Sequence, residues 1–406
     1  MSLHLPPAFT TLQLPLLLLT NILALTIGPR HRLLQLAFTL PALLLLAAQS
    51  LYRDYTGAWG IHYGMNCGVA SMLATYVDWV VLRSPDREGW VKLRGRFGGG
   101  GGESNVDVKG GGKEKRGAPR TFRERLWWAV RLGFTNRYTG WSSEVKHVPV
   151  EVGDGCPRWR FLLRKSLRAV LFYLAKDAIY AYTASSPHGS WVDIATSKPP
   201  HSYASYPFWH RFWFSWIQIV LTYVSLELYN TVVGIVSVAA GLARPSECPS
   251  LFGDLRGLWS IRRAWSVVWH QQCRRVCSGP SIFIVRDVLH LRKGSFASRY
   301  LQLFIAFAIS GLVHGGASML YHNSYEDDGA MKAFLAQAVI IFVEDHLVVF
   351  GKRAGLKDSA FWRLVGCVWT LLAIGASMEG WTGRLLKYGL WVHEREVDWF
   401  GIGPKL

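Results

Sequence analysis

Apolar residues occur along the chain in runs long enough to cross a lipid bilayer. These runs fall near residues 8–27, 34–51, 61–82, 161–183, 208–240, 298–320, 330–350 and 361–383. A helix of about 20 apolar residues spans the hydrocarbon core. The pattern therefore predicts an all-α polytopic membrane protein with about eight transmembrane helices. The run at 161–183 is amphipathic and is expected to lie partly at the interface or against other helices. The run at 208–240 is long enough for a tilted or broken helix.

A basic, glycine-rich segment interrupts this pattern. Between residues 84 and 120, glycine runs at 98–102 and 110–112 lie among Lys and Arg residues. A segment of this composition cannot bury a core, so it predicts a flexible linker. The chain is thereby divided into N-terminal transmembrane helices (1–83), the linker (84–120) and a larger membrane region (121–406).

Composition and charge narrow the functional classes. Half of the residues are hydrophobic, there are 19 Trp, and the formal net charge is +18. The excess Lys and Arg lie between and beside the apolar runs, which favours cytosolic loops facing anionic lipid over a nucleic-acid surface. The same bias predicts that the connections after the first and third runs are cytosolic. The six cysteines lack C-x-x-C spacing, and no metal site is expected.

One histidine stands inside an otherwise apolar run. His314 lies within the segment 304–321, at a depth where a polar side chain is costly. A functional site is the default interpretation, because imidazole is the side chain best suited to move a proton near neutral pH. The alternative is a histidine that only bonds to a neighbouring helix.

The segment 248–275 is too polar to span a membrane easily. Its Trp259, Trp265 and Trp269 alternate with arginines, which predicts an interfacial or re-entrant helix. The arginines are candidates for binding the phosphates of a nucleotide-bearing donor, with lipid headgroup anchoring as the alternative.

This segment resembles a signature of the wax synthase-like group of membrane-bound O-acyltransferases. In that group a stretch like S-P-L-F-G-x-L-x-x-x-x-S-L-R-x-F-W-G-R-x-W-H-Q precedes one like S-G-L-x-H. The matching positions here are Pro249, Leu251–Gly253, Leu255, Ser260, Arg262, Trp265, Trp269–Gln271, Ser310–Leu312 and His314. An upstream stretch, 135–149, is similar to the group's N-x-R-G-I-G-W-x-x-x-V-K-x-x-P element. Ala264, Ser266 and Val267 depart from the F-W-G-R pattern, a change expected to reshape the acyl pocket or alter donor contacts.

The resemblance implies roles for particular residues. His314 is the expected general base, and His270 its partner, orienting the thioester or donating to the oxyanion. The residues expected to shape the substrate and donor pocket are Trp269, Gln271, Trp265, Arg262, Arg137 and Trp141. Glu344, in the next apolar run, is a candidate to orient His314, with structural pairing between helices as the alternative.

The resemblance also implies an activity. Fungal members of the group acetylate terpenoids and meroterpenoids, so the expected reaction moves acetyl from acetyl-CoA to a hydroxyl of a lipophilic secondary metabolite. The enzyme is expected in the endoplasmic reticulum membrane, with acyl-CoA as co-substrate and no bound cofactor. The alternatives are a wax-ester synthase and, outside the enzymes, a proton-coupled transporter whose intramembrane His and Glu form a relay.

Overall fold

The computed structural model confirms the all-α class. It describes residues 7–53, 55, 59–93, 121–190, 203–322, 324–326 and 328–392. Within these ranges the only β pairing is an isolated bridge between Lys92 and Trp141. The long helices are α1 (Pro7–Ile27), α2 (Arg32–Ala48), α3 (Trp59–Tyr76), α5 (Arg158–Ala184), α7 (Phe208–Ala239), α10 (Phe296–His322), α11 (Ala330–Arg353) and α12 (Ala360–Lys387).

Shorter elements connect the long helices. They are α4 (Phe122–Gly133), α8 (Ile261–Arg263), α9 (Arg274–Ile282), the π-helical turns η3 (Val77–Leu82), η8 (Ala264–Val268) and η9 (Phe283–Val288), and the 3-10 turns η1 (Pro29–His31), η2 (Gln49–Leu51), η4 (Asn136–Tyr138), η5 (Tyr203–Ser205), η6 (Pro245–Glu247) and η7 (Leu255–Gly257). The polar segment 248–275 is thus a series of short turns rather than a single helix.

Each apolar run predicted from the sequence coincides with a helix. Among the described residues, six helical stretches are long and apolar enough to span a membrane: Pro29–Leu51, Gly60–Leu82, Phe208–Ala239, Phe296–His322, Ala330–Arg353 and Ala360–Lys387. The apolar part of α1, Thr11–Ile27, is shorter, and α5 carries several charges along its length. The prediction of about eight spans is therefore supported for six. The run at 208–240 is one continuous helix of 32 residues.

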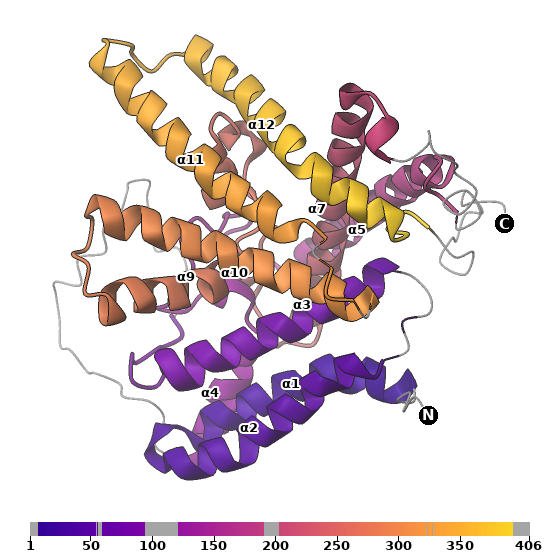
Figure 1. Ribbon diagram of the computed structural model, residues 1–406. Helices are drawn as coiled ribbons and strands as arrows, with labels where there is room; N and C mark the ends of the chain where they lie inside the picture. Colours follow the sequence, from indigo (N-terminus) through magenta and orange to yellow (C-terminus); the bar gives the residue numbers. More distant parts are fainter. Residues whose placement is uncertain are drawn as a thin grey trace.

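The helices pack in layers from the N-terminus to the C-terminus (Figure 1). α1, α2 and α4 lie together at one side, and α3 separates them from α10. α10 packs on α11, and α12 contacts both α11 and α7. The N-terminal helices therefore form one wall of the region around α10. The hydrophobic core of that wall includes Leu17 of α1, Tyr76 of α3 and Trp128 of α4.

The start of the expected linker is ordered, contrary to the prediction for 84–120. Trp90 is buried in the N-terminal core, and its backbone carbonyl accepts a hydrogen bond from Trp128 Nε1 at 3.0 Å. Lys92 Nζ lies 2.9 Å from a Glu247 carboxylate oxygen. The buried indole and the ion pairs of Asp86, Glu88 and Lys92 fix these ten residues despite the basic composition that follows. The rest of the segment, 94–120, lies outside the described residues.

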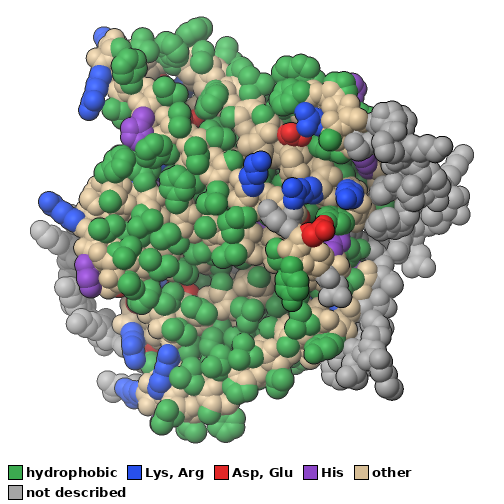
Figure 2. All heavy atoms as spheres, viewed as in Figure 1, with side chains coloured by type: hydrophobic (Ala, Val, Ile, Leu, Met, Phe, Trp, Pro, Cys, Tyr) green, Lys and Arg blue, Asp and Glu red, His purple; other side chains and the backbone are tan. Residues whose placement is uncertain are grey.

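Basic residues gather at one end of the helices. The α1–α2, η9–α10 and α11–α12 connections lie together at that end (Figure 1), and they carry Arg30, Arg32, Arg292, Lys293, Lys352 and Arg353. Figure 2 shows Lys and Arg side chains along that edge, mainly hydrophobic side chains across the middle of the face, and a second group of Lys and Arg side chains right of its centre. This arrangement is typical of a protein whose apolar belt lies in lipid.

Candidate active site

His314 is held in an aromatic box formed by three helices. Gly311, one turn earlier on α10, allows α11 to approach closely, because a Cβ there would lie 3.0 Å from Met331 Cα. This approach brings Phe334 of α11 against the His314 ring, with centroids 4.9 Å apart and planes 10° apart. Trp381 of α12 meets the same ring edge-on at 5.5 Å. Packing on two sides fixes the plane of the imidazole.

The hydrogen bond that orients His314 comes from the N-terminal helices. The hydroxyl of Tyr63, on α3, lies 2.7 Å from His314 Nδ1. Cys67, one turn further along α3, places its Sγ 3.8 Å from the same nitrogen. With Nδ1 engaged in this way, Nε2 is the nitrogen left for chemistry. Tyr63 could not be singled out from the sequence, because nothing in the apolar run at 61–82 distinguishes it from an interfacial tyrosine.

His270 is presented by a tight turn after η8. Gly253 donates a backbone hydrogen bond to Val268 O at 2.8 Å, and a Cβ at position 253 would lie only 2.2 Å from Val267 O. Glycine is therefore required where the two segments touch. The contact brings Phe252 beside His270, edge to face, with centroids 5.6 Å apart.

His270 is neutral and has an uncommitted ring nitrogen. The pKa of His270 is lowered to about 3, mainly by burial, with smaller contributions from His314 in its protonated form and from the Arg137 guanidinium. Within the described residues its buried Nδ1 has no hydrogen-bond partner. An unsatisfied buried ring nitrogen at such a position points to a substrate atom as its partner.

Aromatic rings connect the two histidines. The ring centroid of Phe334, which stacks on His314, lies 6.1 Å from that of Trp265 in η8. The ring centroids of Trp265 and Trp269 are 5.8 Å apart, and those of Trp269 and His270 are 5.5 Å apart. Trp265 is also fixed by donation from its Nε1 to Gln337 Oε1 at 3.0 Å. The structure thus brings Trp265 and Trp269 into the space between His270 and His314.

Gln271 and Arg262 are engaged with other parts of the protein. Gln271 is buried, and its amide donates to the carbonyls of Trp265 and Trp269 at 2.9 and 2.6 Å. Arg262 forms a two-bond pair with Asp345, at 2.8 and 2.6 Å. Both side chains fix the 260–271 segment. Their predicted role in the donor pocket would therefore be to hold this segment in place rather than to contact the donor.

Glu344 does not orient His314. Its two carboxylate oxygens accept from the backbone N–H groups of Ile261 and Arg262, at 2.8 and 3.0 Å. A carboxylate at this position satisfies the free N–H groups at the start of α8. The prediction of an orienting carboxylate differs from the structure, in which the Tyr63 hydroxyl lies against His314 Nδ1. The alternative, structural pairing between elements, describes Glu344.

Arg137 and Trp141 lie in the supporting structure. The Arg137 guanidinium donates to the carbonyls of Pro249, Ser250 and Leu251 at 3.2, 2.9 and 3.1 Å. Its backbone is in the left-handed region, with φ of 57°. Trp141 is buried in the N-terminal core and donates to Thr135 Oγ1 at 3.1 Å. The 135–149 element therefore holds the 248–253 segment in place through the hydrogen bonds of Arg137.

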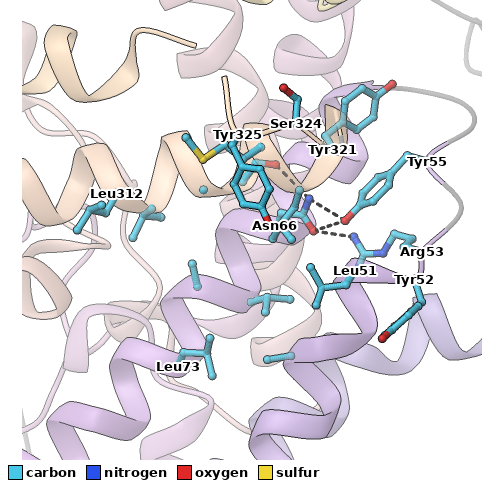
Figure 3. A pocket seen from close by; sticks show the side chains of 18 residues that line it. Leu51, Tyr52, Arg53, Tyr55, Asn66, Leu73, Leu312, Tyr321, Ser324 and Tyr325 are labelled. Atoms are coloured by element: carbon cyan, nitrogen blue, oxygen red, sulfur yellow. Dashed lines mark hydrogen bonds between the residues drawn. The ribbon is translucent and has the colours of Figure 1, made fainter. Parts of the chain in front are cut away.

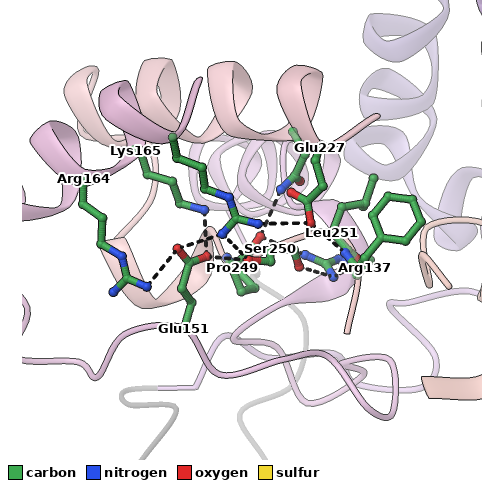
Figure 4. A network of polar contacts seen from close by, with 11 residues as sticks. Arg137, Glu151, Arg164, Lys165, Glu227, Pro249, Ser250 and Leu251 are labelled. Carbon is green, nitrogen blue, oxygen red and sulfur yellow. Dashed lines mark hydrogen bonds and ion pairs between the residues drawn. The ribbon is translucent and has the colours of Figure 1, made fainter. Parts of the chain in front are cut away.

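A network of buried charges holds the same segment from its other side (Figure 4). Glu227 of α7 is fully buried and accepts from Phe252 N at 3.0 Å. Glu151 pairs with Lys165 at 2.8 Å and with Arg168 at 3.3 Å. Arg168 in turn reaches Ser250 Oγ at 2.7 Å and Glu227 at 3.5 Å. The segment that presents His270 is thus tied to both α5 and α7.

Comparison with known proteins identifies the family. Residues 248–336, which contain both histidines, match the membrane bound O-acyl transferase family. The chain is 45% identical over 397 residues, 98% of its length, to "Acetyltransferase sirH" of Leptosphaeria maculans, covering 96% of that protein. It is 31% identical to "Acetyltransferase ple2" of Rhodocybe pseudopiperita over 65% of the chain and 67% of that protein, and 28% identical to "Acetyltransferase eriL" of Hericium erinaceus over 66% and 68%. No solved structure matches the chain. With one relative this similar along nearly its whole length, the chain belongs to the membrane-bound O-acyltransferase family and is a multi-pass membrane acyltransferase.

Proposed function

We propose that this enzyme transfers acetyl from acetyl-CoA to a hydroxyl of a lipophilic secondary metabolite of the terpenoid or meroterpenoid class, in the endoplasmic reticulum membrane. The observation that carries the proposal is His314 in an aromatic box, with Nδ1 fixed by Tyr63 and with His270 connected to the box through the rings of Trp265 and Trp269. The similar proteins named as acetyltransferases support acetyl as the group transferred. The wax-ester and transporter alternatives gain no such support.

His314 acts as the general base in this proposal. When its Nδ1–H donates to the Tyr63 oxygen, 2.7 Å away, the Nε2 lone pair is free to accept a proton. The acceptor hydroxyl gives its proton to Nε2 as its oxygen attacks the thioester carbonyl. A positioned base of this kind contributes about 10²–10⁴-fold. Collapse of the tetrahedral intermediate then breaks the carbon–sulfur bond, and the CoA thiolate takes the proton back from His314.

His270 stabilises the oxyanion. A neutral imidazole presents one N–H donor, and burial keeps His270 neutral at physiological pH. Aimed at the former carbonyl oxygen, such a donor supplies a few kcal/mol in a site that excludes water. Trp265 and Trp269 line the space between the two rings and exclude water from it.

The proposal assigns sides to the two substrates. The basic connections described above face the cytosol under the positive-inside rule, and the water-soluble CoA donor enters from that end. The lipophilic acceptor arrives from the bilayer. Arg262 and Gln271 shape the donor path by fixing the 260–271 segment.

Acyl-CoA assays on microsomes test this function. Membranes from a host expressing the chain are incubated with a hydroxylated terpenoid extract and either [¹⁴C]acetyl-CoA or [¹⁴C]palmitoyl-CoA. We expect label from acetyl-CoA in a new ester that empty-vector membranes do not form. Label transferred only from palmitoyl-CoA to a long-chain alcohol would overturn the acetyl assignment in favour of wax-ester synthesis.

Tyr63→Phe tests the orienting hydrogen bond. The variant keeps the ring, which lies 6.0 Å from that of His314, and removes only the hydroxyl. We expect kcat to fall about tenfold with little change in KM for acetyl-CoA, since one hydrogen bond to a group that becomes charged is lost. Tyr229→Phe, at a lipid-exposed hydroxyl on α7, is the matched control. Unchanged kcat in Tyr63→Phe would remove Tyr63 from the mechanism.

A further inference from the structure

A cavity lies beside the N-terminal helices, and neither His270 nor His314 is among its lining residues. It has a volume of about 860 Å³ and lies between α2, α3 and α10 (Figure 3). Leu73 of α3 and Leu312 of α10 are among its apolar wall residues, whereas His314 and Tyr63 do not line it. Leu51 and Leu312, which also line it, are 65% and 64% exposed. The cavity therefore reaches the apolar outer surface of the helices, which in a membrane protein contacts lipid.

One end of this cavity carries a buried positive charge. Arg53 is 5% exposed, and its guanidinium donates to the side-chain oxygens of Asn66, at 3.1 Å, and Gln13. The Tyr55 ring lies 5.6 Å from it. These partners are all neutral, and no described carboxylate forms an ion pair with Arg53. Figure 3 shows Arg53, Tyr55 and Asn66 together at one end, with Leu73 and Leu312 at the other.

This combination specifies the chemistry of a ligand. A buried guanidinium is normally paired with an anion, because leaving water is costly for an uncompensated charge. Only two of the five N–H donors of Arg53 are used in the hydrogen bonds above. The planar fork that remains matches a carboxylate, which accepts two parallel hydrogen bonds. The apolar walls and lipid-facing opening match a long hydrocarbon chain.

We propose that this cavity binds a long-chain carboxylate from the membrane, with its acid group on Arg53 and its chain along α3 and α10. Arg53 is the one Lys or Arg among the described lining residues, which favours a head group with one negative charge over a phosphate monoester. The site is separate from the acetyl-transfer site, and its occupancy does not require CoA or an acceptor. A failure to bind a long-chain carboxylate would therefore not count against acetyl transfer. Absence of acetyl transfer would likewise not count against this binding site.

Binding to purified full-length protein in an uncharged detergent tests the proposal. The probes are [³H]oleate and its neutral analogue [³H]oleyl alcohol, with no CoA present. We expect oleate to bind saturably at one site per chain, and the alcohol about tenfold or more weakly, because the charge-assisted hydrogen bonds are lost. Arg53→Gln is expected to abolish this preference. Equal binding of the two probes would overturn the proposal.

A second pair of variants tests the cavity without altering Arg53. Gly316 lines the cavity, and a Cβ there meets no heavy atom within 4 Å. Gly316→Leu therefore fills the space without a backbone clash and is expected to weaken oleate binding at least tenfold. Gly380→Leu, at an equally open helical glycine of α12, is the matched control and should bind as wild type. Normal binding by Gly316→Leu, or displacement of oleate by much lower concentrations of phosphatidic acid, would contradict the assignment.

Discussion

Replacing His314 with alanine is expected to reduce acetyl transfer by about 10²–10⁴-fold, the range that a positioned general base contributes. The Tyr63 hydroxyl and the Phe334 ring then face an empty site, and no other described base takes the place of Nε2. Both kcat and kcat/KM should fall together, since the proton transfer occurs only in the transition state. Initial rates of labelled ester formation, with saturating acetyl-CoA, measure the loss.

His314→Gln and His346→Gln separate chemistry from folding. His314→Gln removes the base but retains most of the side-chain volume between Phe334 and Trp381. It should be as inactive as the alanine variant. Its size-exclusion elution profile in detergent should match that of the wild type. His346 is an exposed histidine on α11 whose Nδ1 bonds to Phe342 O of its own helix at 2.7 Å. His346→Gln should retain full activity. Substantial ester formation by a well-folded His314→Gln would assign the base to another residue.

The helices could be predicted from the sequence, and the two histidines could be singled out as site candidates, for clear reasons. Apolar runs of bilayer length impose helices, because backbone groups in lipid must bond within their own segment. His314 is visible because a polar residue in such a run is costly. His270 is visible because its neighbours Trp269 and Gln271 belong to a recognisable motif. Both signals are local in sequence, and the structure places both residues in one aromatic region.

The partners of these residues could not be predicted because they are distant in sequence. Tyr63 and His314 are separated by 251 positions, and only the packing of α3 on α10 brings them together. For Glu344, the need for a partner was predicted but the partner itself was not. A carboxylate in an apolar helix was correctly expected to need a partner, yet that partner is the start of α8 rather than an imidazole. Periodicity predicts which residues share a face, but not which face of another helix they meet.

The ordered stretch 84–93 was missed because composition averages over a window. The glycines and lysines that follow dominate the pattern, while the buried indole of Trp90 and the ion pairs of Asp86, Glu88 and Lys92 fix the first ten residues. The charged network of α5 was also underestimated. An amphipathic run with Arg and Lys indicates an interface, but it does not reveal that Lys165 is 1% exposed beside Glu151.

Replacing Glu151 with glutamine is expected to lower the free energy of unfolding by about 3 kcal/mol, the usual cost of removing one partner from a buried ion pair. Lys165 would keep its charge at 1% exposure, and Arg168 would lose one of its carboxylate contacts. The segment at Ser250, which accepts from Arg168 and donates to Glu151, should loosen as well. The apparent melting temperature in detergent measures the effect. Asp254→Asn, which breaks an exposed pair with Arg256, is the control and should leave it unchanged.

Acid provides an independent test of the same ion pair. Burial by itself would raise the pKa of Glu151, but the charges of Lys165 and Arg168 outweigh it and hold the pKa below the ordinary value of 4.5. A carboxyl whose pKa is depressed on folding stabilises the protein fully above the pKa of the unfolded chain, and that stability is lost as the pH falls through the folded value. The wild type should therefore lose part of its thermal stability below about pH 4.5, whereas Glu151→Gln lacks this component. Combining Glu151→Gln with Lys165→Met removes the stranded charge and should restore much of the lost stability. A double variant no more stable than Glu151→Gln alone would show that Lys165 and Glu151 do not support the fold as a pair.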